Sequence, residues 1–130
     1  MATLLKPKGE QRRRQRQMAE ARGRAAEDRA AAFFEASGCH VLARRVRTGA
    51  GEIDLVAASA TTLIFAEVKL RATALAAAES LRPLQCRRLA GAAEIILARH
   101  PDWLRDETRF DVVLISKQGL LHLPDAFRPE

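Results

Sequence analysis

The apolar residues in the first part of the chain follow a helical period. Between residues 19 and 38 an alanine-rich stretch, AEARGRAAEDRAAAFFEASG, spaces its larger apolar side chains three and four positions apart, as on one face of a helix. Gly38 suits a helix end, because glycine accepts the left-handed backbone found there. We therefore predict a helix from about Ala19 to Gly38, with a buried stripe formed by Ala26, Ala30, Phe33 and Phe34.

A second helical pattern runs from Pro83 to about Arg99. Proline fits the first turn of a helix, where its missing N–H costs no hydrogen bond, and Pro101 stands just beyond the predicted end. The inward positions predicted from the period are Leu84, Leu89, Ala92, Ala93 and Ile96.

Five shorter segments are apolar, rich in β-branched residues and bounded by turn-forming residues, which is typical of strands. The first three are separated only by the turn-like TGAG and the polar ASATT, so we predict antiparallel hairpins. The last two are split by Gly119 and are predicted to pair with each other. The segments are 40–47 (HVLARRVR), 51–57 (GEIDLVA), 62–71 (TLIFAEVKLR), 109–116 (RFDVVLIS) and 120–124 (LLHLP).

The order helix, three strands, helix, two strands predicts an α/β sandwich with a mixed central sheet flanked by helices. A chain of 130 residues, 48% of them hydrophobic, supports one domain with a real core, which we assign to residues 19–130. Residues 1–18 lack apolar periodicity and are predicted to form a flexible basic arm. Residues 72–80 are predicted to be irregular or weakly helical.

The net charge of +6 is concentrated at the start of the chain. Residues 1–24 hold eight basic and two acidic side chains, and the rest of the chain is neutral overall. Such an arm attracts phosphate backbones through counterion release, although the same composition suits a solvated arm that only aids solubility. The candidate nucleic-acid contacts are Arg12, Arg13, Arg14, Arg16, Arg44, Arg45, Arg47, Arg87 and Arg88.

The composition disfavours several classes of protein. No apolar run approaches the roughly 20 residues of a membrane span, and the amino terminus is polar where a signal peptide carries its apolar segment. We therefore expect a cytoplasmic protein. Cys39 and Cys86 are far apart and outside any zinc-ligand pattern, which favours free thiols. Asp111 is expected to pair with an arginine rather than to bind a metal.

Charged side chains interrupt the two central predicted strands. Because strand residues alternate between faces, Glu67 and Lys69 share one face, and Glu52 and Asp54 share a face of the preceding strand. A hairpin centred in the intervening loop pairs residues whose numbers sum to 121, which sets Asp54 opposite Glu67. Like charges in that position repel, so the pair requires a compensating cation.

Two cations meet that requirement, the Lys69 ammonium and a divalent metal ion. Two carboxylates with a backbone carbonyl and waters form a half-shell for magnesium or manganese. A metal held in this way polarises a phosphodiester and generates hydroxide near neutral pH, while a lysine steadies the attacking water or the developing charge. Metal-dependent phosphodiester hydrolysis by Asp54, Glu67 and Lys69 is therefore the functional interpretation. An ordinary exposed face with an ion pair is the alternative.

The segments GEIDLVA, LIFAEVKLR and RFDVVLI, preceded by AAEDRAAAFFEASG, resemble the YraN-like family of bacterial proteins over about residues 23–118. That family is similar in fold to the restriction-endonuclease-like superfamily of PD-(D/E)xK nucleases, especially archaeal Holliday junction resolvases. The resemblance implies a restriction-endonuclease-like three-layer sandwich. It also implies that Asp54 and Glu67 bind the metal ion, that Lys69 takes part in catalysis and that Glu27 is an auxiliary ligand.

The sequence departs from the family pattern at Gln85, where such proteins usually carry a lysine. Related nucleases of other families use a glutamine on this helix near the metal, so Gln85 is kept as an auxiliary residue. Glu52 belongs to the GEID pattern of the family and is also auxiliary, without a distinct chemical role.

Three functions are compatible with these observations. The first is a magnesium- or manganese-dependent endonuclease acting on structured or branched DNA, for which the resemblance to junction resolvases implies a homodimer. The second is a catalytically inactive module with a nuclease-like fold that binds nucleic acid. The third is a small interaction protein whose acidic cluster is a salt-bridged feature of the core.

Overall fold

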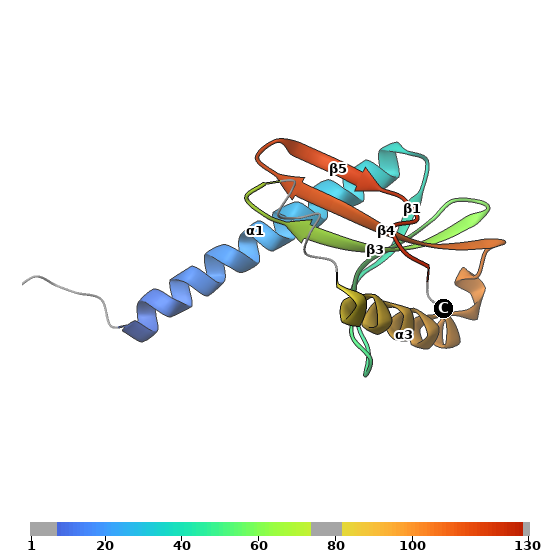
Figure 1. The fold of residues 1–130 in the computed structure, drawn as a ribbon, viewed down its shortest axis with the longest axis horizontal. Coiled ribbons are helices and arrows are strands. Elements are labelled where there is room, and N and C mark those ends of the chain that lie inside the picture. Colours follow the sequence, from blue (N-terminus) through green and yellow to red (C-terminus); the bar gives the residue numbers. More distant parts are fainter. Residues whose placement is uncertain (1–7, 74–81, 129–130) are drawn as a thin grey trace, which may run out of the picture.

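Five strands form one mixed sheet in the computed structural model, which describes residues 8–73 and 82–128 (Figure 1). The order is β1-β2-β3-β4-β5. Neighbouring strands are antiparallel except β3 and β4, which are parallel, so both groups of predicted hairpins are confirmed. The strands are β1 (His40–Arg47), β2 (Glu52–Ala58), β3 (Thr62–Leu70), β4 (Glu107–Ser116) and β5 (Gly119–Leu123).

Helices pack on both sides of this sheet. The helix α1 (Lys8–Ala36) crosses one face, and α3 (Pro83–Arg99) lies against the other, followed by the short 3-10 helix η1 (Pro101–Trp103) (Figure 1). This arrangement is the predicted three-layer α/β sandwich with a mixed central sheet. No helix in the described part of the chain has the length and apolar content needed to cross a bilayer. The prediction for residues 72–80 falls mainly on residues 74–81, which lie outside the described ranges.

The first helix begins at Lys8 rather than near Ala19. Residues 8–18, predicted to belong to a flexible arm, are therefore helical. The apolar pattern did not reveal this, because every side chain from Lys8 to Arg22 is exposed and buries no stripe against the sheet. Arginine, glutamine and glutamate have high intrinsic helix propensity, and this part of α1 projects beyond the sheet (Figure 1). Gly38, with φ of 91°, follows the helix end as predicted.

Two apolar clusters fill the space between the helices and the sheet. On β3, Ile64 and Ala66 pack towards α1, whereas Leu63 and Phe65 pack towards α3. The strand alternation therefore puts Glu67 and Lys69 on the α3 side. The predicted inward residues of α3 are buried except Leu84, which is 52% exposed because it lies in the first turn of the helix. Those buried residues are Leu89, Ala92, Ala93 and Ile96.

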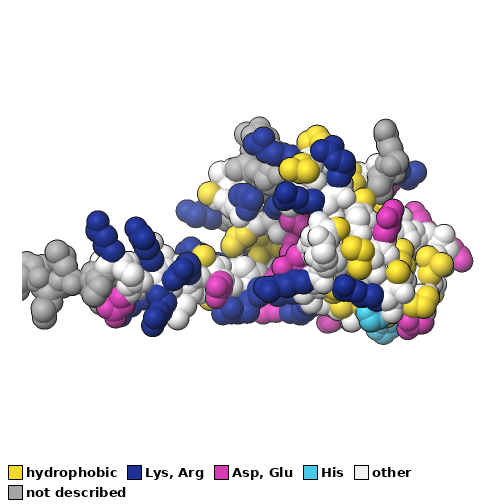
Figure 2. Space-filling model, turned by 90° about the horizontal axis from the view of Figure 1, so that it is seen from below, with side chains coloured by type: hydrophobic (Ala, Val, Ile, Leu, Met, Phe, Trp, Pro, Cys, Tyr) yellow, Lys and Arg dark blue, Asp and Glu magenta, His cyan; other side chains and the backbone are white. Residues whose placement is uncertain are grey.

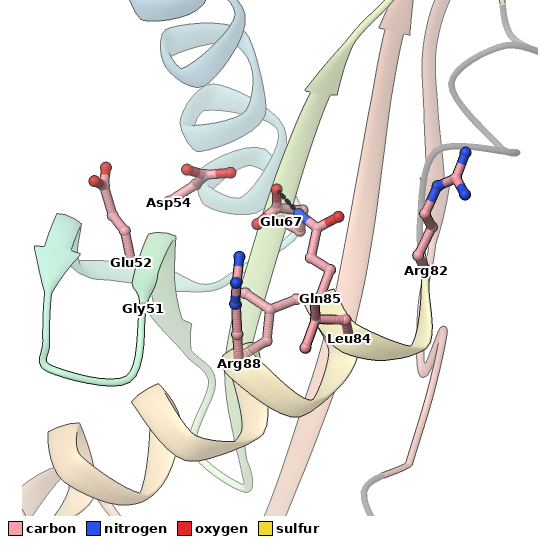
Figure 3. Close-up of a pocket in the computed structure, with 9 residues that line it drawn as sticks. Gly51, Glu52, Asp54, Glu67, Arg82, Leu84, Gln85 and Arg88 are labelled. Carbon is pink, nitrogen blue, oxygen red and sulfur yellow. Dashed lines mark hydrogen bonds between the residues drawn. The ribbon is translucent and has the colours of Figure 1, made fainter.

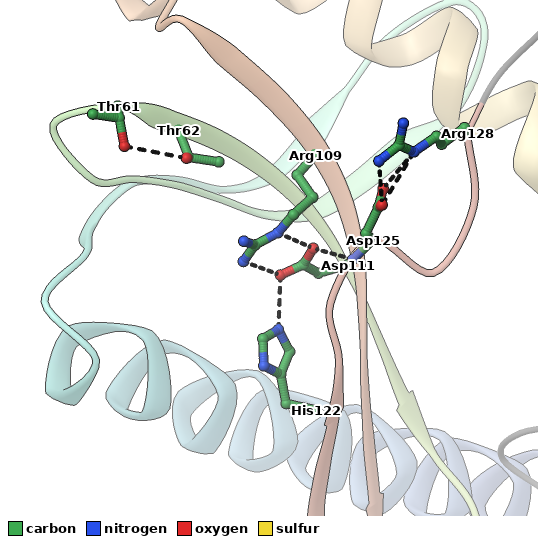
Figure 4. Close-up of polar contacts among 7 residues, drawn as sticks. All are labelled: Thr61, Thr62, Arg109, Asp111, His122, Asp125 and Arg128. Atoms are coloured by element: carbon green, nitrogen blue, oxygen red, sulfur yellow. Dashed lines mark hydrogen bonds and ion pairs between the residues drawn. The ribbon is translucent and has the colours of Figure 1, made fainter.

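Asp111 of β4 is the centre of a buried polar cluster (Figure 4). Arg109 Nε and Nη2 donate to its two carboxylate oxygens at 2.8 and 2.9 Å, which confirms the predicted pairing with an arginine. His122 Nε2 lies 2.7 Å from the same carboxylate, and the backbone N–H of Asp125 donates to it at 3.0 Å. The cluster ties β5 and the following segment to β4.

The helix α3 approaches the turn between β1 and β2 closely. A Cβ added at Gly91 would lie 3.1 Å from the Cβ of Ala50, so glycine is what permits this approach. The contact holds the first turns of α3 beside the start of β2, where the charged residues of the central strands lie.

Candidate functional site

The β2–β3 hairpin has the register predicted from the sequence. Leu55 pairs with Ala66, and the pairing continues in the same register to the loop. Beyond Leu55 the backbone ladder gives way to a side-chain contact, in which Asp54 Oδ2 accepts a hydrogen bond of 2.8 Å from the backbone N–H of Val68. The Asp54 carboxylate therefore lies between the two strands, beside Glu67.

A pocket of about 580 Å³ opens between the start of β2, the end of β3 and the first turns of α3 (Figure 3). It brings together several candidates from three separate segments of the sequence. Arg82 also lines the pocket and is not among the residues predicted from the sequence. Its position directly before Pro83, at a predicted helix start, is the signal that could have found it. The lining residues are Gly51, Glu52, Asp54, Glu67, Arg82, Leu84, Gln85, Arg88 and Leu89.

Glu67 is buried and is held by two side chains at one oxygen. Gln85 Nε2 donates to Glu67 Oε1 at 2.8 Å (Figure 3), and Lys69 Nζ lies 3.1 Å from the same oxygen. Lys69 is itself buried, with 8% of its surface exposed. The E-x-K pair is therefore a buried ion pair rather than the exposed one of the alternative interpretation, and Gln85 contacts it directly from α3.

Asp54 is the side chain whose ionisation the site perturbs most clearly. The pKa of Asp54 is raised from 3.8 to about 7, first because burial disfavours the carboxylate and next because Glu67 carries a negative charge. The hydrogen bond from Val68 acts in the opposite direction. Asp54 and Glu67 repel each other at the wall of the pocket, and a cation placed next to them would favour the ionised form of both carboxylates.

Glu27 of α1 reaches the same region but is engaged in an ion pair. Arg45 Nε donates to both Glu27 carboxylate oxygens, at 2.5 and 2.9 Å, and Glu27 is only 8% exposed. The neighbouring Arg44 pairs with Asp28 at the surface. Arg47 lies 3.5 Å from Glu52. The arginines of β1 therefore contact carboxylates of their own chain.

The other candidate nucleic-acid contacts lie on the surfaces of the two helices. The four arginines within residues 8–18 are exposed, as are Arg87 and Arg88 of α3, and Arg88 also lines the pocket. Figure 2 shows acidic side chains gathered in a hollow of the body, with basic side chains around it and along the projecting helix. The four predicted contacts on α1 are Arg12, Arg13, Arg14 and Arg16.

The pocket offers carboxylate oxygens as possible metal ligands. Within residues 8–73 and 82–128, no group of three or more aspartate, glutamate, histidine or cysteine side chains is placed to hold a metal ion. Asp54 and Glu67 are two carboxylates that line the same pocket. Hard oxygen donors of this kind suit magnesium or manganese, which commonly keep several waters in their coordination shell.

Comparison with known proteins identifies the family. Residues 26–115 match the model of the uncharacterised protein family UPF0102. The chain belongs to the UPF0102 family. A UPF0102 protein of Acidiphilium cryptum is 51% identical over 126 residues, which are 97% of this chain and 98% of the relative. A UPF0102 protein of Azorhizobium caulinodans is 52% identical over 119 residues, 91% of each chain.

This membership confirms the resemblance to the YraN-like family. The range that matches the UPF0102 model contains Glu27, Asp54, Glu67, Lys69 and Gln85. The exposed first half of α1 lies before that range. The pocket of this UPF0102 protein is therefore built from the part of the chain that defines the family, whereas its projecting basic helix is not.

Proposed function

We propose that this UPF0102 protein is a magnesium- or manganese-dependent endonuclease that hydrolyses phosphodiester bonds in structured or branched DNA. The observation that carries the proposal is the shared pocket of Asp54 and Glu67, with Lys69 fixed 3.1 Å from Glu67. An aspartate and a glutamate at one wall of the pocket are ligands for a hard cation, and the buried lysine that pairs with the glutamate adds a group that stabilises negative charge.

Each residue has a defined part in the proposed reaction. A divalent cation, when bound, supplies polarisation of the phosphodiester and activation of water. Asp54 and Glu67 bind that cation, and Gln85 orients Glu67 through its 2.8 Å hydrogen bond. Lys69 is held by Glu67 and presents its ammonium group to the developing negative charge or to the attacking water.

The surroundings of the pocket favour a polyanionic substrate. The first turns of α3 line the pocket together with Arg82 and Arg88, and the N-terminus of a helix favours phosphate groups. The basic side chains around the acidic hollow and along α1 (Figure 2) extend this positive surface. Contacts of this kind position a phosphate backbone without reading its sequence, which suits recognition of DNA shape. Cleavage of two opposed strands further implies a homodimer.

A second function is favoured by the contacts of the carboxylates. Glu27 pairs with Arg45, and Glu67 contacts Gln85 and Lys69. Side chains of the protein itself therefore already bind these two carboxylates without a metal ion. A module of this kind binds nucleic acid through its arginines without turnover. The two functions share a binding surface and differ in whether the pocket takes up a divalent cation.

The test is incubation of the purified protein with labelled four-way junctions, flaps and linear duplex, with Mn²⁺ or with a chelator. We expect Mn²⁺-dependent cleavage that falls at least about 100-fold in Asp54→Asn and Glu67→Gln. Asp28→Asn is the matched control, because Asp28 is an exposed carboxylate outside the pocket. Cleavage that persists in both pocket variants would refute the assignment of the reaction to Asp54 and Glu67. Binding that falls steeply with salt, without cleavage, would favour the inactive module.

A further inference from the structure

Arg45 has an unusual backbone conformation for its residue type and position. Its φ is 50°, which makes it one of two non-glycine residues with positive φ in the described part of the chain. The left-handed region is unfavourable for a side chain with a Cβ, whereas glycine and asparagine enter it readily. Arg45 lies within β1, so a helix end does not account for this conformation.

Arg45 lies next to two carboxylates, those of Asp54 and Glu27. Its neighbours Arg44 and Val46 pair with Leu55 and Ile53, so Arg45 lies across from Asp54. On the other side, its guanidinium donates to both oxygens of Glu27. The pKa of Arg45 is raised, first by the hydrogen bond with Glu27 and further by the charges of Glu27, Glu52 and Asp54.

The adjacent arginine provides an internal comparison. Arg44 also pairs with a carboxylate of α1, but Asp28 is 67% exposed, whereas the Glu27 side chain is 10% exposed. An exposed pair contributes little, while a buried carboxylate requires a partner. Arg45 bonds Glu27 and lies across from Asp54 in the strand register, so the Glu27–Arg45 pair stands next to the proposed cation site. Arg45 therefore neutralises a carboxylate that would otherwise increase the negative charge of that site.

We propose that Arg45 is a positioning residue that serves as the resident counter-charge of Glu27 and keeps this carboxylate from binding the divalent cation. Asp54 and Glu67 are then the protein ligands of that cation, and Glu27 does not join them. The inference rests on the proposed function, because it concerns the cation that Asp54 and Glu67 are proposed to hold.

The test uses Arg45→Asn and the double variant Arg45→Asn, Glu27→Gln in the full chain. Asparagine tolerates the left-handed backbone, so Arg45→Asn removes the guanidinium without straining β1. Arg45→Gly serves as a second variant for the same reason. Arg44→Asn is the matched control. Mn²⁺ affinity is measured by isothermal titration calorimetry in low salt, after circular dichroism has established that each variant is folded.

We expect Arg45→Asn to bind Mn²⁺ about tenfold more tightly than the wild type, since a nearby charge alters such equilibria by about one order of magnitude or more. The double variant should lose this gain, and Arg44→Asn should match the wild type. A purely structural role of Arg45 predicts weaker binding in Arg45→Asn. Unchanged or weaker binding would overturn the inference, and so would a gain that the double variant or Arg44→Asn also shows.

The same titrations separate the inference from the proposed function. If the wild type binds no Mn²⁺ and Arg45→Asn binds it in a way that the double variant loses, Arg45 keeps Glu27 from the cation as inferred, but the wild-type cation site of Asp54 and Glu67, and with it the proposed function, fails. If the wild type binds Mn²⁺ and Arg45→Asn binds no more tightly, the inference fails and the proposed function stands. Absence of binding in both proteins overturns both.

Discussion

Replacement of Asp54 by asparagine should change how stability depends on pH. The pKa of Asp54 in the folded protein is about 7, against an ordinary value of 3.8. The folded state therefore holds this proton more tightly than the unfolded chain does. Stability from this group is greatest below about pH 4 and is lost as the pH rises to about 7. Asparagine cannot ionise, and its side-chain oxygen can still accept the hydrogen bond from Val68.

The magnitude follows from the two pKa values. A group with these values lowers the free energy of unfolding by about 2 to 3 kcal/mol between pH 5 and pH 8, relative to a variant without the charge. Urea unfolding of metal-free wild type and Asp54→Asn measures this difference at each pH. Acids elsewhere in the chain titrate in both proteins, so their contributions largely cancel in the comparison.

The control is Asp28→Asn, which removes an exposed carboxylate paired with Arg44. Its stability relative to the wild type should vary by less than about 0.5 kcal/mol over the same pH range. If the wild type and Asp54→Asn show parallel pH profiles from pH 5 to pH 8, Asp54 is not a half-buried carboxyl group beside a second negative charge, and the electrostatic description of the pocket is wrong.

Three further predictions concern other parts of the structure. Gln85→Ala should lower the free energy of unfolding by about 1 kcal/mol, because it removes the hydrogen bond to Glu67, whereas the exposed Leu84→Ala should change it by less than about 0.5 kcal/mol. Asp111→Ala should lower the free energy of unfolding by about 3 to 5 kcal/mol, since Arg109 and His122 lose a buried partner. Arg128→Ala is the control, because Arg128 is an exposed arginine whose ion pair contributes little. Replacement of four arginines of α1 by glutamine should leave thermal unfolding unchanged; these are Arg12, Arg13, Arg14 and Arg16. The slope of log binding constant against log salt concentration for DNA should become shallower by up to about 3.6, for four lost phosphate contacts. An unchanged slope would show that α1 does not contact the DNA.

The register of the central hairpin was predictable because it depends on local features. An apolar alternation in two adjacent segments, with a short polar loop between them, leaves one register that buries both apolar faces. That register brought Asp54 beside Glu67. The splay of the strands beyond Leu55, and the use of the Asp54 side chain as a partner for Val68, depend on the backbone path and have no sequence signal.

Contacts between segments far apart in the chain were not predictable in the same way. The pairing of Glu27 with Arg45 requires both the packing of α1 on the sheet and a left-handed backbone at an arginine. Arginine rarely adopts the left-handed backbone, so the sequence of β1 predicts an ordinary extended conformation at this position. Similarly, the helical start of α1 carries no apolar stripe, and apolar periodicity is the signal from which helices were predicted here.

The proposed function requires that Asp54 and Glu67 jointly hold a divalent cation. Anomalous diffraction at the manganese absorption edge, on crystals soaked with Mn²⁺, locates such an ion directly. We predict a peak within about 2.0 to 2.6 Å of one oxygen of each carboxylate, the range of hard cations, and its loss in Glu67→Gln. A map without a peak between these two side chains, or one in which the peak persists in Glu67→Gln, would contradict the claim.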